Sequence, residues 1–216
     1  MTQPLRIDFV SDIACPWCVI GLRSLDVALG RLAGEVQVEL HFQPFELNPQ
    51  MSSEGEEIGE HLARKYGSTP EQAERNREAI RARGASLGFT FDMQKRARIY
   101  NTFDAHRLLM WADTCGKERQ LKDALFTAYF TDGKNPSDLA TLAEVAASVG
   151  LDPNRAREIL DSGEFANEVR EREQFYHRNG IHAVPSVIVN NRHLIQGGQP
   201  PGVFEQALRE LSKQVA

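Results

Sequence analysis

The stretch SDIACPWCVIG, residues 11–21, places two of the chain's three cysteines three residues apart, with a proline and a tryptophan between them. The segment before it, LRIDFV at 5–10, alternates in hydrophobicity and predicts a strand. The segment after it has leucines on one helical face, at positions 22, 25, 29 and 32. We therefore expect Cys15 and Cys18 at a junction between a strand and a helix.

The composition is typical of a globular chain, with 41% hydrophobic and 25% charged residues among 216. A net charge of -5, from 25 basic and 30 acidic residues, provides no general attraction to nucleic acid. We recognise no signal-peptide pattern at the N-terminus, and no stretch approaches the roughly 20 apolar residues of a membrane span. The expectation is a cytoplasmic protein that binds neither nucleic acid nor membranes.

The order of predicted elements indicates an α/β fold with an all-helical insertion. A second strand is expected at 36–45, and short strands at 186–189 and 193–195 precede a last helix at 202–213. Between them the helical periodicity predicts helices near 56–66, 70–87, 102–115, 118–130, 138–149, 153–161 and 164–178, with Gly67 and Ser137 among the expected caps. Residues 1–50 and 180–216 would then form one α/β domain, and residues 51–179 a helical insertion domain.

The pattern CPWC at the start of a helix favours redox chemistry. Cysteines at i and i+3 in a first helical turn are close enough to form a disulfide. The free N–H groups and partial positive charge at a helix N-terminus favour a thiolate on Cys15, which makes Cys15 the predicted nucleophile and Cys18 the resolving thiol. Pro16 suits the first helical position. Trp17 supplies no positive charge, so we expect a pair that is less oxidising than a CPHC pair.

Metal binding is the main alternative use of this cysteine spacing. Zinc normally takes four ligands, and the chain has no second cysteine pair. Cys115 stands alone near a helix end and is expected to be a small core residue. The remaining histidines show no ligand grouping and are expected at the surface or in loops: His61, His177, His182 and His193. No metal is expected, although a zinc or iron–sulfur site through Cys15 and Cys18 stays open.

Several motifs together resemble the thioredoxin superfamily, and specifically its DsbA-like branch with a helical insertion. These are the strand leading into CPWC, the helical block, and AVPSVIV at 183–189. Further motifs are PFELNP at 44–49, NTFDAHRL at 101–108 and GGQPPG at 197–202. They resemble FrnE-like cytoplasmic relatives, which are similar to 2-hydroxychromene-2-carboxylate isomerases and kappa-class glutathione transferases. The resemblance covers essentially the whole chain and implies a thioredoxin-like fold.

The resemblance implies a thiol-disulfide oxidoreductase. Pro185 would be a cis-proline that faces the cysteine pair, and the Val184 backbone would bind an extended substrate. The isomerases and transferases carry a serine where this chain has Cys15 with a resolving Cys18, which argues for disulfide exchange. A glutathione-dependent isomerase or transferase, and chaperone-like binding of unfolded chains, stay as alternatives.

The same resemblance sets the expected partners. No cofactor is expected beyond the Cys15–Cys18 disulfide itself, with glutathione as a possible co-substrate. The expected partners are protein or small-molecule thiols and disulfides, for a monomer or homodimer.

Four residues are predicted to contact the substrate: Pro16, Trp17, Val184 and His106. An apolar rim around Cys15 is expected from Trp17 and Val184 with Phe45 and Ile181. Trp17 packed against the helical block is the alternative.

Charged residues near the pair have two possible roles each. Asp8 is either an acceptor for the proton of Cys18 or an exposed strand residue. Asn101, His106 and Arg107 either anchor an acidic group of a substrate or cap helices and satisfy buried carbonyls.

Overall fold

The computed structural model describes residues 4–214 of the chain. In chain order its elements are β1 (Leu5–Ser11), α1 (Pro16–Arg31), β2 (Val38–Pro44), β3 (Glu56–Glu57), α2 (Ile58–Tyr66), α3 (Pro70–Ser86), β4 (Arg98–Ile99), α4 (Phe103–Thr114), α5 (Glu118–Phe130), α6 (Leu139–Ser148), α7 (Pro153–Ser162), α8 (Ala166–Arg178), β5 (Ser186–Val189), β6 (His193–Gln196) and α9 (Pro201–Ser212). Apart from β3 and β4, the helix and strand positions agree with those predicted from the sequence to within a few residues.

The two ends of the chain form one four-stranded sheet. Its strand order is β2-β1-β5-β6, so that β1 lies at the centre, parallel to β2 and antiparallel to β5. The register places Phe9 of β1 opposite Phe42 of β2 and Val187 of β5. The predicted βαβ and ββα units thus join in a single sheet.

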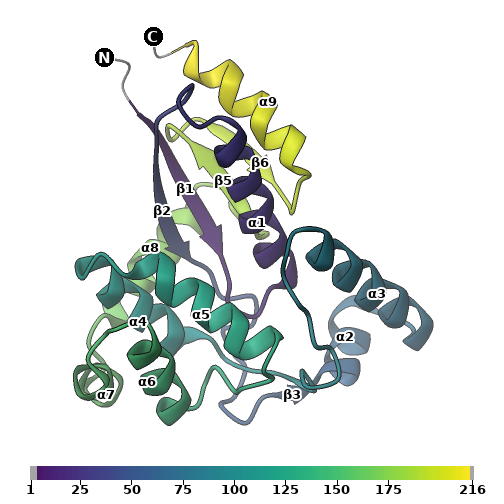
Figure 1. Ribbon diagram of the computed structural model, residues 1–216. Coiled ribbons are helices and arrows are strands. Elements are labelled where there is room, and N and C mark those ends of the chain that lie inside the picture. Colours follow the sequence, from purple (N-terminus) through teal and green to yellow (C-terminus); the bar gives the residue numbers. More distant parts are fainter. Residues whose placement is uncertain (1–3, 215–216) are drawn as a thin grey trace.

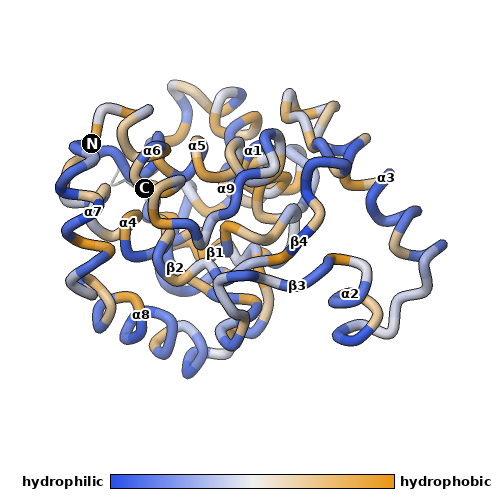
Figure 2. Tube along the Cα trace, turned by 90° about the horizontal axis from the view of Figure 1, so that it is seen from below, coloured by the Kyte–Doolittle hydropathy of each residue, from blue (hydrophilic) through white to orange (hydrophobic). Residues whose placement is uncertain are grey.

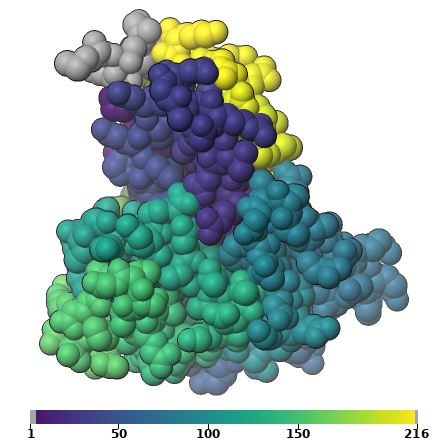
Figure 3. Space-filling model, viewed as in Figure 1, coloured from purple at the N-terminus to yellow at the C-terminus, as the bar shows by residue number. Residues whose placement is uncertain are grey.

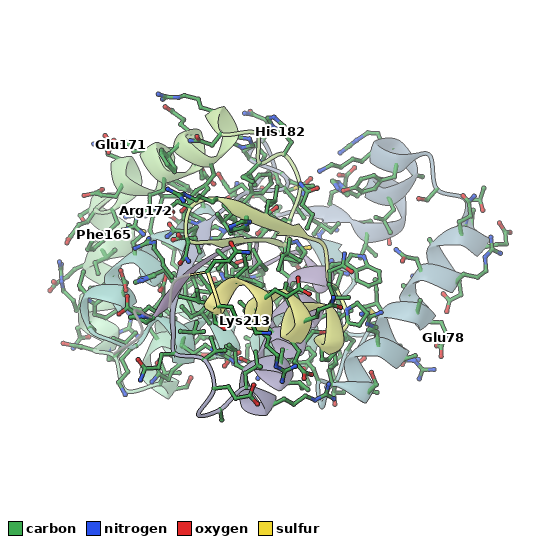
Figure 4. The ribbon with its side chains drawn as sticks, turned by 90° about the horizontal axis from the view of Figure 1, so that it is seen from above. Glu78, Phe165, Glu171, Arg172, His182 and Lys213 are labelled. Atoms are coloured by element: carbon green, nitrogen blue, oxygen red, sulfur yellow. The ribbon has the colours of Figure 1, made fainter. Side chains whose placement is uncertain are left out.

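Helices cover both faces of this sheet. α1 and α9 lie side by side along one face, while α8 packs against β2 on the other (Figures 1 and 4). β1 is consequently buried along its length except at Arg6. Asp8 is 1% exposed, so the alternative that it is an exposed strand residue is wrong. A strand covered on both faces buries even the positions that are out of phase with its apolar residues.

The helical block lies against one end of the sheet. α4 packs against α5, α7 and α8, and α6 packs against α5 and α7 (Figure 1). In Figure 3 this block forms the broad lower part of the molecule, beneath β1, α1 and α9. One continuous apolar core runs from Phe9 through Cys18 to Phe126, so the cysteine pair lies where the sheet meets the block.

Helices α2 and α3 form a separate pair at the side of the molecule, as Figure 2 shows. They pack on each other, and α3 also contacts α1. At their base β3 pairs with β4 in a two-stranded sheet that the sequence did not indicate, because two residues are too few for a periodic signal. Residues 56 and 57, expected in a helix, belong to β3.

The helix ends test individual predictions. Gly67 ends α2 with a φ of 64°, as a C-cap glycine should. The N-cap of α6 is Asp138, whose carboxylate accepts a hydrogen bond from the Thr141 amide, so the prediction of Ser137 was wrong by one residue. The division into domains at residues 50 and 180 stays a prediction.

Candidate active site

Cys15 and Cys18 occupy the start of α1. Cys15 is the N-cap residue, with φ -94° and ψ 112°, and Pro16 takes the first helical position. The Cys18 amide donates to the Cys15 carbonyl oxygen at 3.1 Å, which closes the first turn. Both cysteines are free thiols. Cys15 therefore lies beside the partial positive charge of the helix N-terminus, which stabilises a thiolate.

The two thiols differ in access and in surroundings. Cys15 is 4% exposed and Cys18 is fully buried. Burial, followed by the hydrogen bond and charge of Cys15, raises the pKa of Cys18 well above its ordinary value. A thiol that must lose its proton in a buried site needs an acceptor nearby. This asymmetry suits a pair in which one thiol meets the substrate and the other acts afterwards.

Residues 183–186 approach Cys15 from the loop before β5. The Val184–Pro185 peptide bond is cis, as the resemblance implied. The Cys15 thiol donates a hydrogen bond to the Val184 carbonyl oxygen, with a distance of 3.7 Å from Sγ. Pro185 packs on α1 at Gly21, where a Cβ would lie only 2.9 Å from the proline Cγ. Gly21 thus permits the close approach of the loop to the helix.

The motif GGQPPG completes this contact. The Gly197 amide donates to the Pro185 carbonyl oxygen at 2.8 Å, and Gly197 has a φ of 81°. A Cβ at Gly198 would lie 3.1 Å from the Trp17 carbonyl oxygen and 3.3 Å from its ring. Trp17, which is half-buried, therefore packs against this glycine segment. This contact is with the segment before α9 and not with the helical block, which was the alternative partner for Trp17.

Asp12 is a site residue that the sequence analysis missed. Its side chain is 1% exposed and accepts hydrogen bonds from the Ala14 amide, the Leu47 amide and the Thr102 hydroxyl, at 3.1, 2.7 and 2.8 Å. Burial opposes ionisation, but the nearby His106 imidazole and the amide hydrogen bonds outweigh it, so the pKa of Asp12 is lowered. An aspartate three residues before a helix N-cap is a signal for such a turn.

His106 lies beneath this loop and not on the surface. It is 1% exposed, and its Nε2 atom is 3.7 Å from Asp12 Oδ1 and has no hydrogen-bond partner among the described residues. A side chain so buried is placed to act on the Asp12 carboxylate. Direct substrate contact by His106 therefore has no support from the geometry and stays a prediction.

Two neighbours of His106 support the structural alternative. The Asn101 side chain donates to Glu46 and accepts from the Phe103 amide. Arg107 donates to three backbone carbonyls, at Ile159, Leu160 and Glu164. Both residues thus hydrogen-bond to polar groups of the protein itself.

The charges that act on Cys18 come from Cys15, Asp12 and Lys122. Lys122 of α5 is 1% exposed, with Nζ 5.2 Å from the Phe42 ring centre. Burial lowers the pKa of Lys122, and burial also raises the pKa of Glu118, one helical turn earlier, to about 7. Lys122 is thus a buried titratable group whose charge acts on Cys18, and the half-buried Glu118 acts in turn on Lys122.

Asp8 is engaged elsewhere. Its carboxylate accepts from the Arg6 guanidinium at 2.7 and 2.8 Å and from the Gln43 amide at 2.7 Å. Transfer of the Cys18 proton to Asp8 therefore has no support from these contacts.

Three further expectations are corrected. Phe45 and Ile181 are buried in a small cluster with Val10 and Tyr176, so they form no exposed rim. Cys115 is exposed at the C-terminal end of α4, where it does not reach the core. His61 of α2 is 3% exposed, with Nδ1 2.7 Å from a Glu56 carboxylate oxygen, so it is not a surface residue. Within residues 4–214, no group of three or more potential ligands is placed to hold a metal ion.

Comparison with known proteins extends over nearly the whole chain. A family model described as "DSBA-like thioredoxin domain" matches residues 6–209. A probable DsbA oxidoreductase from Streptomyces coelicolor has 32% identity and a TM-score of 0.90, with 98% of this chain and 91% of that chain covered. An uncharacterized protein of Bacillus subtilis strain 168, YwbO, is 24% identical over 97% of this chain and 98% of its own.

A more distant structure shares the fold. The cytosolic disulfide reductase DsbM from Pseudomonas aeruginosa, solved with GSH, has 16% identity and a TM-score of 0.63, with 97% of this chain and 98% of that chain covered. The predicted α/β fold, thioredoxin-like with a helical insertion, is confirmed by these matches and by the sheet topology.

Proposed function

Because the chain belongs to the DSBA-like thioredoxin domain family, we propose that it exchanges disulfides with protein or small-molecule thiols through Cys15 and Cys18. One observation carries the proposal: Cys15 stands at a helix N-terminus opposite the cis Val184–Pro185 peptide, with the free thiol of Cys18 one turn further on. The Val184 carbonyl accepts a hydrogen bond from the Cys15 thiol, and Pro16 and Trp17 follow Cys15 in the chain, which supports their predicted contact with a substrate.

In the reducing direction the reaction has two steps. The Cys15 thiolate attacks one sulfur of a substrate disulfide, forms a mixed disulfide and releases the other sulfur as a thiolate. Cys18 then loses its proton and attacks Cys15 Sγ, which forms the Cys15–Cys18 disulfide and releases the second substrate thiolate. The protein loses two electrons and the substrate gains them, and the oxidising direction is the reverse.

The second step requires removal of a proton from a buried thiol. Lys122 of α5 supports this role because it is buried and its charge acts on Cys18, and Glu118 supports it indirectly because its charge acts on Lys122. The Glu118 carboxyl, with a pKa raised to about 7, is able to exchange protons near neutral pH. The proton of Cys18 would pass toward α5, an element of the helical insertion.

Several finer features belong to the same proposal. Trp17 between the cysteines supplies no charge to the Cys15 thiolate, which supports a milder oxidant than a CPHC protein. No helix within residues 4–214 is long and apolar enough to cross a membrane. The likeness to a protein named as a cytosolic disulfide reductase, solved with GSH, supports a cytoplasmic location and glutathione as a possible co-substrate. No metal, nucleotide or flavin takes part, because the cysteine pair itself carries two electrons.

Trapping tests the proposal. A Cys18→Ala variant retains the attacking thiol but lacks the resolving one, so we expect it to accumulate mixed disulfides on Cys15 in cells. Cys15→Ala should trap none, and Cys115→Ala should behave as the wild type. Mass spectrometry of the captured species locates the bond. A catalytic turnover with glutathione that survives Cys18→Ser would instead indicate an isomerase or transferase.

A further inference from the structure

A small cavity adjoins the reactive cysteine on the side of α2 and α3. Ala14 and Pro16, the two neighbours of Cys15 in the chain, both line it. Its volume is about 90 Å³, which is the liquid volume of about three water molecules. The cavity therefore has room for the end of one side chain. We call it the Arg96 cavity, after the buried arginine in its wall.

The walls are apolar, but the charges in them all have one sign. Ile58, Ile80 and Ile99 contribute aliphatic surface. Arg96 and Arg77 also line the cavity, together with the His61 imidazole, and no aspartate or glutamate of the described chain does so. An apolar cavity whose only permanent charges are guanidinium groups is complementary to an anion with a short hydrocarbon stem.

Arg96 is the group that most needs a partner. Its side chain is buried, with 7% exposed, and its Nε atom has no hydrogen-bond partner among residues 4–214. No carboxylate of the described residues lies within ion-pair distance of it; its charge rests over the Tyr129 and Phe130 rings, at 5.0 and 4.9 Å. A buried cation without an opposite charge is costly. A ligand carboxylate would offset that cost.

The neighbouring acids are unable to serve Arg96 because other groups hold them. Asp12 accepts hydrogen bonds on both oxygens, from Ala14, Leu47 and Thr102. Glu56, at the base of α2, pairs with His61 and Arg64. A negative charge opposite Arg96 could therefore be supplied by a bound ligand.

The Arg96 guanidinium also lies close to the reactive cysteine. Arg96 Nη2 donates to the Ala14 carbonyl oxygen at 3.3 Å, and Ala14 directly precedes Cys15. A substrate side chain that enters the cavity between Pro16 and Arg96 would therefore belong to a residue close to the substrate cysteine that reacts with Cys15. We propose that the Arg96 cavity receives the carboxylate of an acidic residue next to the reacting cysteine of a peptide substrate. This inference rests on the proposed disulfide exchange and adds a substrate preference to it.

Matched peptide disulfides test the preference. Two peptides of one sequence carry either glutamate or glutamine beside a cysteine activated as its 2-pyridyl disulfide. Attack of Cys15 on the peptide sulfur forms a mixed disulfide and releases pyridine-2-thione, which absorbs in the near ultraviolet; Cys18 then displaces the peptide thiol. On the wild type we expect the glutamate peptide to react about tenfold faster at low salt, and this ratio to fall at high salt.

Variants separate the cavity from general effects. Arg96→Gln should reduce the ratio to about one, and Arg96→Lys, which keeps the charge, should retain part of it. Arg81→Gln is the matched control, because Arg81 is exposed, pairs with Glu78 on α3 and does not line the cavity. Ala73→Leu fills the cavity while Arg96 remains, and should also abolish the preference.

A neutral substrate keeps the two proposals distinguishable. Because Arg96 holds the Ala14 carbonyl, its loss can slow every substrate, so each rate is divided by that with hydroxyethyl disulfide, which carries no charge. Equal rates for the two peptides on the wild type would overturn the inference while leaving disulfide exchange intact. A preference for the glutamate peptide that persists in both Arg96→Gln and Ala73→Leu would also overturn the inference. The proposal would also be contradicted if the two peptides reacted equally fast while Arg96→Gln slowed only the reaction with glutathione disulfide. That result would assign the cavity to a small molecule. No reaction with any disulfide would refute the proposed function itself.

Discussion

Replacement of Gly21 by alanine should separate the cost of crowding Pro185 from the benefit of a better helix former. Gly21 lies inside α1, where alanine is favoured over glycine by about 0.5–1 kcal/mol. A Cβ there would meet Pro185 Cγ at 2.9 Å and Cβ at 3.5 Å. The proline ring is rigid and therefore has to shift, which costs about 1–3 kcal/mol in a packed interior.

Gly30 provides a control within the same helix. No atom of residues 4–214 lies within 4 Å of a Cβ built at this position, so Gly30→Ala should keep the propensity benefit without the clash. We therefore expect Gly30→Ala to be about 1–3 kcal/mol more stable to unfolding than Gly21→Ala. Urea titration of the reduced proteins, followed by circular dichroism, measures this difference.

The same pair of variants tests the site. Displacement of Pro185 moves the Val184 carbonyl, which now accepts a hydrogen bond from Cys15. We expect Gly21→Ala to slow reduction of a model disulfide at least several-fold and Gly30→Ala to leave the rate unchanged. Equal stability and equal rates for the two variants would refute the close packing of Pro185 on α1.

Three further predictions follow from the charges around the pair. At pH 8 iodoacetamide should modify Cys115 and Cys15 before Cys18, because burial raises the pKa of Cys18 and shields it; peptide mapping that finds Cys18 modified first would contradict this. Asp12→Asn should cost about 1–3 kcal/mol at pH 7. The pKa of Asp12 is lowered by folding, so its ionised form stabilises above about pH 4, and the difference should shrink as the pH falls below that value; a constant difference would count against it. Lys122→Met should leave stability unchanged or higher but slow release of product from the mixed disulfide, measured in single turnovers; unaltered release would exclude Lys122 from proton transfer.

Local sequence patterns predicted most of the fold because the signals that begin and end helices are local. The glycine at 67 and the prolines at 70 and 153 mark helix ends whatever surrounds them. The pairing of β3 with β4 has no such signal, since it depends on two short segments about 40 residues apart. Cys115 was placed in the core by its residue type, whereas the end of α4 leaves it exposed.

The candidate site was predictable in part for the same reason. The spacing of Cys15 and Cys18 identifies them as a candidate redox pair. The role of Pro185 could be predicted only from the family resemblance, because most X-Pro bonds are trans. Asp12 carries a turn signal that was available in the sequence. Arg96 and Lys122 carry none. Their importance arises only because the helical insertion folds back beside the cysteine pair.

The most direct test of the central claim is a redox titration of Cys15 and Cys18 against glutathione buffers, followed by mass spectrometry of acid-quenched samples. We predict a single two-electron transition that forms an intramolecular Cys15–Cys18 disulfide, leaves Cys115 reduced, and has a potential well below the roughly -120 mV of the strong oxidant DsbA. A glutathione adduct on Cys15 without the intramolecular bond at any buffer ratio would contradict the claim. A potential near that of DsbA would contradict the inference from Trp17.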